Sequence, residues 1–177
     1  MNRIHRMLCL LAALLVILSV PAFPALAESQ AMECDDMVLT DKDGNEVTLY
    51  SFAGKPVIIN FWATWCPWCV YEFPAYQKLF EQYGDQIVFI MADQCDGYAE
   101  TPEKALAWLE ENGYTFPPYF DTVNYAYRNF GWSGIPGSVF IRADGTVQLA
   151  QLGAMQEEAL FAAAEALLKE APAEAAP

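Results

Sequence analysis

The chain has 177 residues, of which 55% are hydrophobic and 14% are aromatic, and this is enough apolar material for one full core. All 23 acidic residues follow residue 27, whereas only seven of the nine Lys and Arg residues do, so the chain beyond residue 27 carries a formal charge of −16. An acidic chain without a basic patch repels phosphate backbones, which excludes nucleic acid as a natural partner. We interpret the acidity as a source of solubility in an exposed compartment.

The first 27 residues have the pattern of a secretory signal. A short basic stretch that ends at Arg6 is followed by an apolar run over residues 7–20, and then by small residues and prolines that end at Ala27. This order predicts cleavage after Ala27. An uncleaved anchor over residues 7–27 stays open as the alternative, because this stretch is uncharged and nearly long enough to span a bilayer. In either case we expect the folded part outside the cytoplasm, as a periplasmic, secreted or membrane-anchored protein.

After a polar lead-in over residues 28–36, two short strand-like runs predict a β-hairpin. The runs are residues 37–40 and 46–50, and the segment between them, 41–45, contains the Asp, Gly and Asn residues that favour turns. The next strand is expected at 57–62, where the nearly unbroken apolar character indicates burial on both faces of a sheet. This strand is therefore expected at the centre of the sheet.

A helix is expected to begin at Cys66 or Pro67 and to end at about Tyr83, before Gly84. Proline is well tolerated in the first turn of a helix, and glycine is common directly after the last turn. A second buried strand follows over residues 87–92, which are all apolar.

Two further helices are predicted in the middle of the chain. Thr101 is the expected N-cap of the first, with Pro102 at its first position and Gly113 at its end. A shorter helix is expected after Asp121 and ends near Phe130.

The C-terminal part predicts a hairpin followed by a helix. Strands are expected at 138–141 and 146–152, joined by a tight turn over residues 143–145, and the helix over 156–168 has Leu and Ala residues on one face. The tail 171–177 consists of Ala, Pro and Glu, and we expect it to be disordered because it has nothing to bury.

The predicted order of elements is β-β-β-α-β-α-α-β-β-α, without an internal repeat. Alternating strands and helices of this kind predict one α/β domain over residues 37–170, with a mixed β-sheet flanked by helices and an N-terminal β-hairpin.

Cys66 and Cys69 are the candidate working residues, in the run WCPWC over residues 65–69. Because they are three residues apart on one helix face, their sulfurs are close enough for a reducible disulfide. Cys66 stands at the expected helix N-terminus, where free backbone N–H groups and the helix dipole stabilise a thiolate. The thiolate is the attacking species in disulfide exchange, so Cys66 is the expected nucleophile, and Cys69, one turn deeper, is expected to resolve the mixed disulfide.

Three other uses of this cysteine pair have less support. A zinc site would need Cys34 and Cys95 as further ligands, but both are isolated and the chain beyond the predicted signal has no histidine. A haem attachment site would need histidine after the second cysteine, where Val70 stands. An inert structural disulfide is disfavoured by the position between a buried strand and a helix start, flanked by Trp65 and Trp68, which favours exposure and reactivity.

Four sequence features in the same order resemble the TlpA/ResA-like thioredoxin-fold proteins. Residues 60–69, NFWATWCPWC, resemble the active-site segment of that family, and GKPVII over 54–59 resembles the lead-in to it. The acid–aromatic–proline run at 72–74 and the GIP run at 134–136, which a strand follows, resemble two further family features. The resemblance extends over about residues 37–168, and it implies a thioredoxin-like fold and thiol–disulfide exchange.

The resemblance also implies how client proteins are bound. It identifies Ile135–Pro136 as a cis bond that lies against the disulfide and leaves the Ile135 backbone free to pair with a substrate strand; a trans turn proline is the alternative. Gly137 departs from the threonine expected in the family, and we expect a looser loop there. The expected substrate-binding residues are Trp65, Pro67, Trp68, Ile135 and Pro136.

For function, the resemblance implies an extracytoplasmic reductase of protein disulfides, for instance in apocytochrome c, that draws electrons from a membrane thiol–disulfide donor. No cofactor or metal is expected, and we expect a monomer whose partners are client proteins with disulfides or thiols. Two alternatives stay open: a DsbA-like oxidant, since proline also follows the nucleophile in such relatives, and a binding module without turnover. Thiol peroxidase chemistry is disfavoured, because Ile59 and Ala63 stand where it needs proline and Thr or Ser.

Glu72 is the candidate proton carrier. Thioredoxins have a buried aspartate beneath the cysteines, whereas this chain has Asn60 there, and an amide cannot accept the proton of the resolving thiol. Glu72 stands three residues after Cys69, one turn along the helix, and its family counterpart lies in the active site. Desolvation beside Trp65 and Phe73 is expected to raise its pKa into the range of general acid–base work; an acid that only favours the helix dipole is the alternative.

The remaining cysteines beyond the signal, Cys34 and Cys95, leave two alternatives open. An even number of cysteines in an oxidising compartment favours the hypothesis of a structural Cys34–Cys95 disulfide, if the N-terminal hairpin reaches the edge of the sheet near Cys95. Two separate thiols are the alternative, because the sequence does not establish the Cα separation that a disulfide needs.

Overall fold

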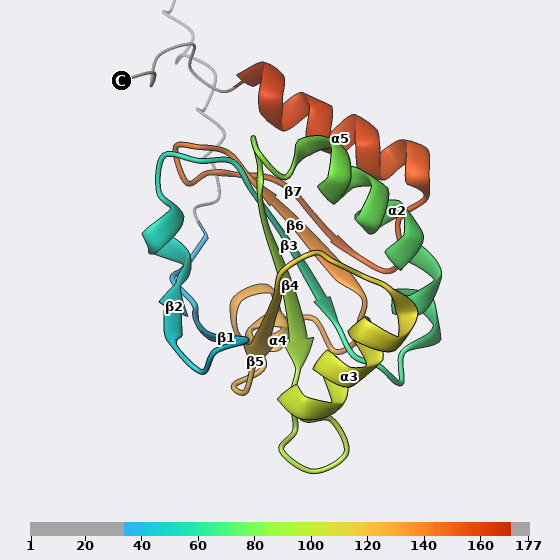
Figure 1. The fold of residues 1–177 in the computed structure, drawn as a ribbon. Coiled ribbons are helices and arrows are strands. Elements are labelled where there is room, and N and C mark those ends of the chain that lie inside the picture. Colours follow the sequence, from blue (N-terminus) through green and yellow to red (C-terminus); the bar gives the residue numbers. More distant parts are fainter. Residues whose placement is uncertain (1–33, 171–177) are drawn as a thin grey trace, which may run out of the picture. The chain divides into compact units, whose positions relative to one another are not determined.

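A seven-stranded mixed sheet forms the centre of the fold (Figure 1), with the strand order β2-β1-β5-β4-β3-β6-β7. The α/β class, the mixed sheet and the N-terminal hairpin predicted from the sequence are thereby confirmed. The strands are β1 (Val38–Asp41), β2 (Glu46–Thr48), β3 (Val57–Trp62), β4 (Val88–Gln94), β5 (Pro118–Asp121), β6 (Gly137–Ile141) and β7 (Val147–Leu152).

The computed structural model describes residues 34–170 of the chain. The predicted signal, the first part of the lead-in (28–33) and the tail 171–177 lie outside the described residues. Among the helices of residues 34–170, none has the length and apolar character needed to cross a membrane.

β3 is an interior strand of the sheet, one place from its middle strand β4, as its apolar run indicates. All six of its residues are buried, and it pairs in parallel with β4 and antiparallel with β6. In the register with β4, Trp62 at the end of β3 stands beside Asp93. The segments that follow β3 and β4 therefore leave the sheet at the same edge.

β5 corrects the order of elements expected from the sequence. It pairs in parallel with β4 and antiparallel with β1, and so joins the N-terminal hairpin to the rest of the sheet. The strand has four residues and begins with Pro118, which has no N–H to donate to a ladder. Its formation depends on the two neighbouring strands, which a local sequence pattern does not show.

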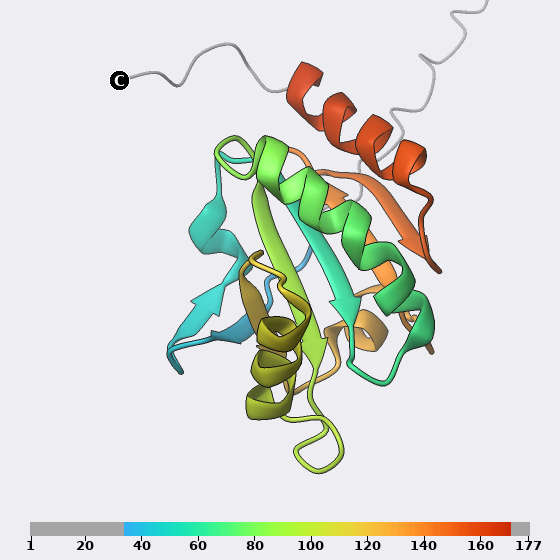
Figure 2. The same ribbon diagram turned by 45° about the vertical axis from the view of Figure 1, so that its right-hand side comes forward.

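Helices cover both faces of the sheet (Figures 1 and 2). α2 (Pro67–Tyr83), α3 (Pro102–Asn112) and α5 (Glu157–Glu170) pack in one apolar cluster on the first face. α4 (Tyr125–Phe130) and the short 3-10 helix η1 (Leu49–Phe52) belong to a second cluster on the other face.

Successive side chains of β3 divide between these two faces. Ile58 and Trp62 belong to the cluster with α2, whereas Ile59 and Phe61 belong to the cluster with α4. Asn60 lies between Ile58 and Trp62 in this alternation and is the one polar residue of the strand. The alternation therefore directs Asn60 toward α2.

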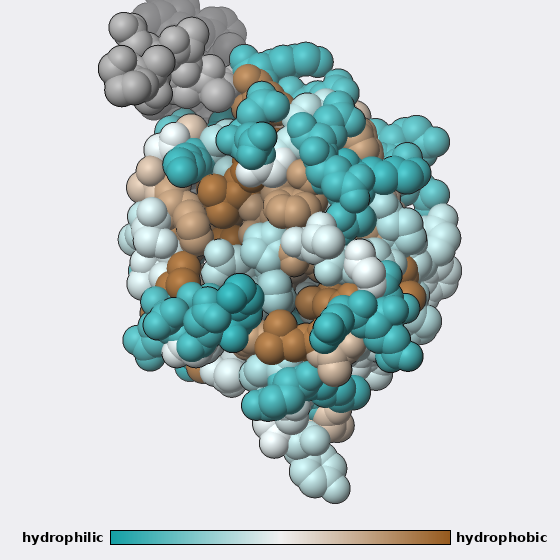
Figure 3. Space-filling view, viewed as in Figure 1, coloured by the Kyte–Doolittle hydropathy of each residue, from teal (hydrophilic) through white to brown (hydrophobic). Residues whose placement is uncertain are grey.

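The surface seen in Figure 3 is mostly hydrophilic, with smaller hydrophobic patches between the polar groups. This distribution agrees with the acidic composition of the chain. The buried apolar residues belong to two clusters, one on each face of the sheet.

Cys34 and Cys95 are separate free thiols, so the hypothesis of a Cys34–Cys95 disulfide is wrong. Cys34 is buried in the cluster on the α4 face, whereas Cys95 packs against the cluster on the α2 face. The sheet thus keeps the two thiols in different parts of the core.

Candidate active site

The turn between β3 and α2 carries the two candidate cysteines. The backbone N–H of Cys66 donates to the carbonyl oxygen of Ala63 (3.1 Å), and α2 then begins at Pro67, as predicted. Cys66 is the N-cap of α2, where its Sγ accepts a hydrogen bond from the backbone N–H of Cys69 (3.2 Å). A sulfur at this position faces the free N–H groups of the first turn, which stabilise negative charge.

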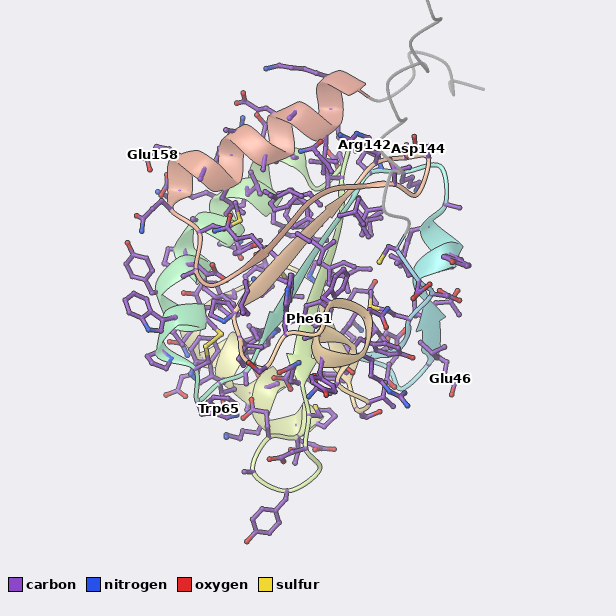
Figure 4. All side chains as sticks on the ribbon, turned by 180° about the vertical axis from the view of Figure 1, so that it is seen from behind. Glu46, Phe61, Trp65, Arg142, Asp144 and Glu158 are labelled. Carbon is purple, nitrogen blue, oxygen red and sulfur yellow. A yellow bond between two sulfur atoms is a disulfide. The ribbon has the colours of Figure 1, made fainter. Side chains whose placement is uncertain are left out.

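Cys66 and Cys69 form a disulfide, with Cα atoms 5.3 Å apart. Cys66 is 3% exposed and Cys69 is fully buried, so the expectation of an exposed pair is wrong for the cysteines themselves. Their neighbours are exposed instead, with Trp65 at 61% and Trp68 at 64%. Figure 4 shows Trp65 at one end of the sheet, near the yellow disulfide.

Three exposed aromatic residues around the disulfide form a surface that we call the aromatic rim: Trp65, Trp68 and Tyr71. The rings of Trp68 and Tyr71 meet edge to face with centroids 6.0 Å apart, and the Tyr71 hydroxyl donates to Gln156 Oε1 (3.2 Å). Pro67, another predicted substrate-binding residue, is exposed beside them. Exposed aromatic side chains of this kind are enriched where proteins dock.

Glu72 is buried on α2, three residues after Cys69, with 1% of its surface exposed. Its Oε1 accepts a hydrogen bond from Asn60 Nδ2 (2.7 Å), and its Oε2 accepts one from the backbone N–H of Met155 (2.9 Å). Burial raises the pKa of Glu72 to about 7, against the effect of these two hydrogen bonds, which favour the carboxylate. A carboxyl with such a pKa can both accept and release a proton at neutral pH.

A chain of buried polar groups continues from Glu72 between α2 and the neighbouring strands β3 and β6. Asn60 Nδ2 also donates to Ser138 Oγ (3.3 Å), and the hydroxyl oxygens of Ser138 and Tyr76 are 2.7 Å apart. Asn60 Oδ1 has no hydrogen-bond partner among the residues that the structure describes. Rotation of the Asn60 amide by a half turn directs this oxygen toward Glu72, where it can accept the proton of a neutral carboxyl. The amide therefore suits both protonation states of Glu72.

The Ile135–Pro136 peptide bond is cis, as the family resemblance implies. Pro136 is buried, and Ile135 packs against the cluster that contains both cysteines. Gly137 is buried within β6, so the expectation of a looser loop at this residue is wrong. A Cβ atom at residue 137 would overlap the ring of Trp132, and this close approach explains the glycine.

The sequence patterns did not point to Glu100, although this residue contacts the turn that carries Cys66. Glu100 is fully buried in the loop between β4 and α3. Its carboxylate oxygens accept hydrogen bonds from the backbone N–H and the hydroxyl of Thr64, both at 2.8 Å. One feature of the sequence could have pointed to Glu100, namely its position shortly after β4. β3 and β4 are parallel neighbours, so the segments that follow them, with Thr64 and Glu100, leave the same end of the sheet.

Comparisons with known proteins agree with this site. Residues 31–150 match the model of the AhpC/TSA family. The thiol-disulfide oxidoreductase ResA of Bacillus anthracis is 31% identical over 128 residues, which are 72% of either chain. ResA of Geobacillus thermodenitrificans is 33% identical over 123 residues, which are 70% of this chain and 69% of that protein.

Solved structures show the same fold. A Chlorobium tepidum protein assigned as the thiol:disulfide interchange protein DsbE superposes with a TM-score of 0.69 and is 26% identical, over 78% of this chain and 96% of that one. StoA from Bacillus subtilis superposes with a TM-score of 0.62 at 20% identity, over 76% of this chain and 98% of that one, and supports the fold alone.

The family match spans the cysteine pair, Glu72 and the cis proline. The chain belongs to the AhpC/TSA family and is a thiol–disulfide oxidoreductase of the ResA type with a thioredoxin-like fold.

Proposed function

We propose that the protein reduces disulfides in client proteins outside the cytoplasm, through a dithiol–disulfide cycle of Cys66 and Cys69. The observation that carries this proposal is the buried Glu72 carboxyl, which stands one helical turn from Cys69 and has a pKa raised to about 7. A base of this kind serves a cycle in which the resolving thiol must lose its proton at neutral pH.

In the reduced protein, the Cys66 thiolate attacks one sulfur of a client disulfide. The client S–S bond breaks, a mixed disulfide forms between Cys66 and the client, and the other client sulfur leaves as a thiolate. Cys69 then gives its proton to Glu72 and attacks the Cys66 sulfur, which closes the Cys66–Cys69 disulfide and releases the second client sulfur. Two electrons pass from the dithiol to the client, whose thiolates take protons from Glu72 and solvent.

Client binding in this proposal uses the aromatic rim and the cis-proline loop. The exposed rings of Trp65 and Trp68, with Pro67 between the cysteines, offer apolar contact that does not depend on one particular sequence. The backbone of Ile135 before Pro136 pairs with an extended client segment. Both kinds of contact suit unfolded or extended clients, and the family resemblance makes apocytochrome c an example.

The location and the source of electrons are further parts of the proposal. The signal-like segment over residues 1–27 supports a location outside the cytoplasm, with the segment either cleaved or kept as an anchor. After each turnover the Cys66–Cys69 disulfide must be reduced again, and we infer a membrane thiol–disulfide donor for this step. The protein acts as a monomer in this scheme.

Insulin reduction and the reduction potential of the Cys66–Cys69 pair test the direction of the reaction. We expect thiol-dependent reduction of insulin and a potential near that of thioredoxin, about −270 mV. A potential near about −120 mV would identify a disulfide-forming oxidant instead. The absence of thiol-dependent turnover in either direction would leave a binding module.

The roles of the two cysteines are tested by trapping. Cys69→Ser should accumulate mixed disulfides with clients, because it removes the resolving thiol and keeps Cys66 at the N-terminus of α2. Cys66→Ser, the matched control, should accumulate far fewer. Equal trapping by both variants on a non-reducing gel would contradict this assignment of nucleophile and resolving cysteine.

A further inference from the structure

Glu100 is a buried charge that lies outside the cysteine pair. Its side chain has no exposed surface, although it carries an ion pair with Lys104, whose side chain is 47% exposed. A buried carboxylate is tolerated only where hydrogen bonds replace its lost water. The hydrogen-bond partners of Glu100 therefore indicate which part of the structure this buried carboxylate holds in place.

Thr64 is the main partner, and it is bound at two points. Glu100 Oε1 accepts from the backbone N–H of Thr64 and Oε2 accepts from its hydroxyl, each at 2.8 Å. Lys104 Nζ donates to the same Oε2 at 2.8 Å and to the Ala99 carbonyl oxygen at 2.7 Å. Two short bonds to an ionised acceptor restrain both the backbone and the side chain of Thr64, which a single bond does not achieve.

Thr64 occupies the centre of the turn that leads to the nucleophile. The turn is closed by the hydrogen bond from the Cys66 N–H to the Ala63 carbonyl oxygen (3.1 Å), and Thr64 and Trp65 stand between these two residues. A rotation of Thr64 thus displaces Trp65 of the aromatic rim and the Cys66 N-cap of α2. The hydrogen bonds that restrain Thr64 therefore also restrain Trp65 and Cys66, which in the proposed function contact the client.

The loop that supplies Glu100 is itself firmly held. Asp96 Oδ1 accepts from the backbone N–H groups of Tyr98 (2.8 Å), Ala99 (2.7 Å) and Glu100 (2.9 Å). The Glu100 carbonyl oxygen accepts from the Asp96 N–H (3.1 Å), and α3 begins directly afterwards with Thr101 as N-cap. Glu100 is therefore fixed between a closed loop and a helix start, as an anchor requires.

A second buried acid, Asp93, stands beside Glu100 at the end of β4. Asp93 is fully buried, and its Oδ2 accepts a hydrogen bond from Cys95 Sγ (3.0 Å). Burial and the neighbouring Glu100 raise the pKa of Asp93 to about 8. At neutral pH Asp93 is consequently neutral beside Glu100, so two adjacent buried anions are avoided.

We propose that Glu100 is a positioning residue of the redox reaction, which holds, through Thr64, the turn that presents Cys66 to client disulfides. The inference rests on the proposed reduction of client disulfides and adds to it a residue that acts without touching sulfur. Loss of either Thr64 bond should slow the attack of Cys66 on a client in protein that is still folded.

The test compares single-turnover rates of the fully reduced protein with insulin. Thr64→Val removes the hydroxyl and keeps the shape, and should lower the rate about tenfold, which corresponds to one hydrogen bond to a charged group. Thr64→Ser keeps the hydroxyl and should restore the rate to within about twofold of wild type. Glu100→Gln should lower the rate as Thr64→Val does, whereas Glu103→Gln, an exposed acid in the first turn of α3, should leave it unchanged.

Thermal unfolding of each variant separates positioning from a purely structural role. If Thr64→Val and Glu100→Gln lower Tm but react at the wild-type rate while folded, the proposal is overturned. Should Glu100→Gln fail to fold, the contrast between Thr64→Val and Thr64→Ser decides. Wild-type protein that does not reduce insulin contradicts the proposed function itself, whereas active wild type with unaffected variants contradicts only the role of Glu100.

Discussion

At the scale of single residues, the buried pair of Glu72 and Asn60 determines how a proton can move beside the cysteines. The carboxyl accepts hydrogen bonds from the Asn60 amide and from the Met155 N–H, and both bonds favour the ionised form. Desolvation favours the neutral form and outweighs them, because the pKa is raised to about 7. The two opposing effects leave the carboxyl close to half protonated at neutral pH.

Replacement of this carboxyl tests its role in the exchange reaction. In Glu72→Gln, resolution of the mixed disulfide should be about 100-fold slower at pH 8, because the Cys69 thiol loses its general base. In wild type the rate of this step should rise as the pH passes about 7, since only the carboxylate accepts a proton, and the variant should lack this rise. Stopped-flow measurement of mixed-disulfide decay between pH 5 and 9 gives both quantities.

Glu81→Gln is the matched control, since Glu81 is an exposed acid on the same helix. It should keep the wild-type profile. A Glu72→Gln protein with the wild-type rate and profile would show that another group accepts the proton.

Residue positions were predictable from the sequence where a short segment fixes them. The spacing of Cys66, Cys69 and Glu72 places all three on the first turns of one helix, and the structure has them there. The contact between Glu100 and Thr64 joins residues 36 positions apart, and it depends on the path of the loop after β4. No periodicity or motif encodes that path, so this part of the site required the structure.

At the scale of elements, β6 depends on a close contact between its first residue and an aromatic ring. Gly137 lies under the ring of Trp132, which stacks on Phe130 with centroids 4.9 Å apart and meets Phe61 edge to face at 6.3 Å. The ring cannot retreat without disturbing both neighbours. The start of β6, directly after the cis proline, is thus fixed by packing on the α4 face.

Gly137→Ala should therefore destabilise the protein by about 1–3 kcal/mol, the usual effect of overpacking. Gly134→Ala is the control in the same loop, because a Cβ atom there meets nothing within 4 Å, and its free energy of unfolding should stay within about 0.5 kcal/mol of wild type. Urea denaturation of the disulfide-bonded proteins measures both. Equal stability of the two variants would show that Trp132 can move aside.

Element prediction from the sequence succeeded where local signals mark both ends. α2 begins at Pro67 and ends at Tyr83, where the proline and Gly84 place its limits. β5 was missed because its four residues become a strand only between β4 and β1. Its apolar pattern is too short, and its initial proline disfavours a strand in isolation.

At the scale of the whole molecule, buried acids make stability depend on pH. The pKa of Glu72 is raised to about 7 and that of Asp93 to about 8, whereas both groups ionise at their ordinary lower values once the chain unfolds. Between the ordinary and the raised pKa values, the folded state therefore binds more protons than the unfolded state. Under that condition stability falls as the pH rises.

We expect the free energy of unfolding of wild type to decrease between pH 5 and 8. The contribution of Glu72 is about 3 kcal/mol over its full range, from the linkage between pKa and stability. Glu72→Gln and Asp93→Asn should each flatten this dependence, and Glu158→Gln, at an exposed position, should not. Denaturation series at several pH values measure the slopes, and equal slopes in all four proteins would contradict the burial argument.

The hydrogen bond from Cys95 to Asp93 also bears on disulfide scrambling. Burial and the Asp93 interaction raise the pKa of the Cys95 thiol, and burial raises the pKa of Cys34 to about 11. Scrambling requires a thiolate as attacking group, and at neutral pH both thiols stay protonated. Among the cysteines of residues 34–170, Cys69 is then the one available to attack a mixed disulfide on Cys66. In the proposed cycle, the mixed disulfide with a client is therefore resolved by Cys69 without exchange to Cys34 or Cys95.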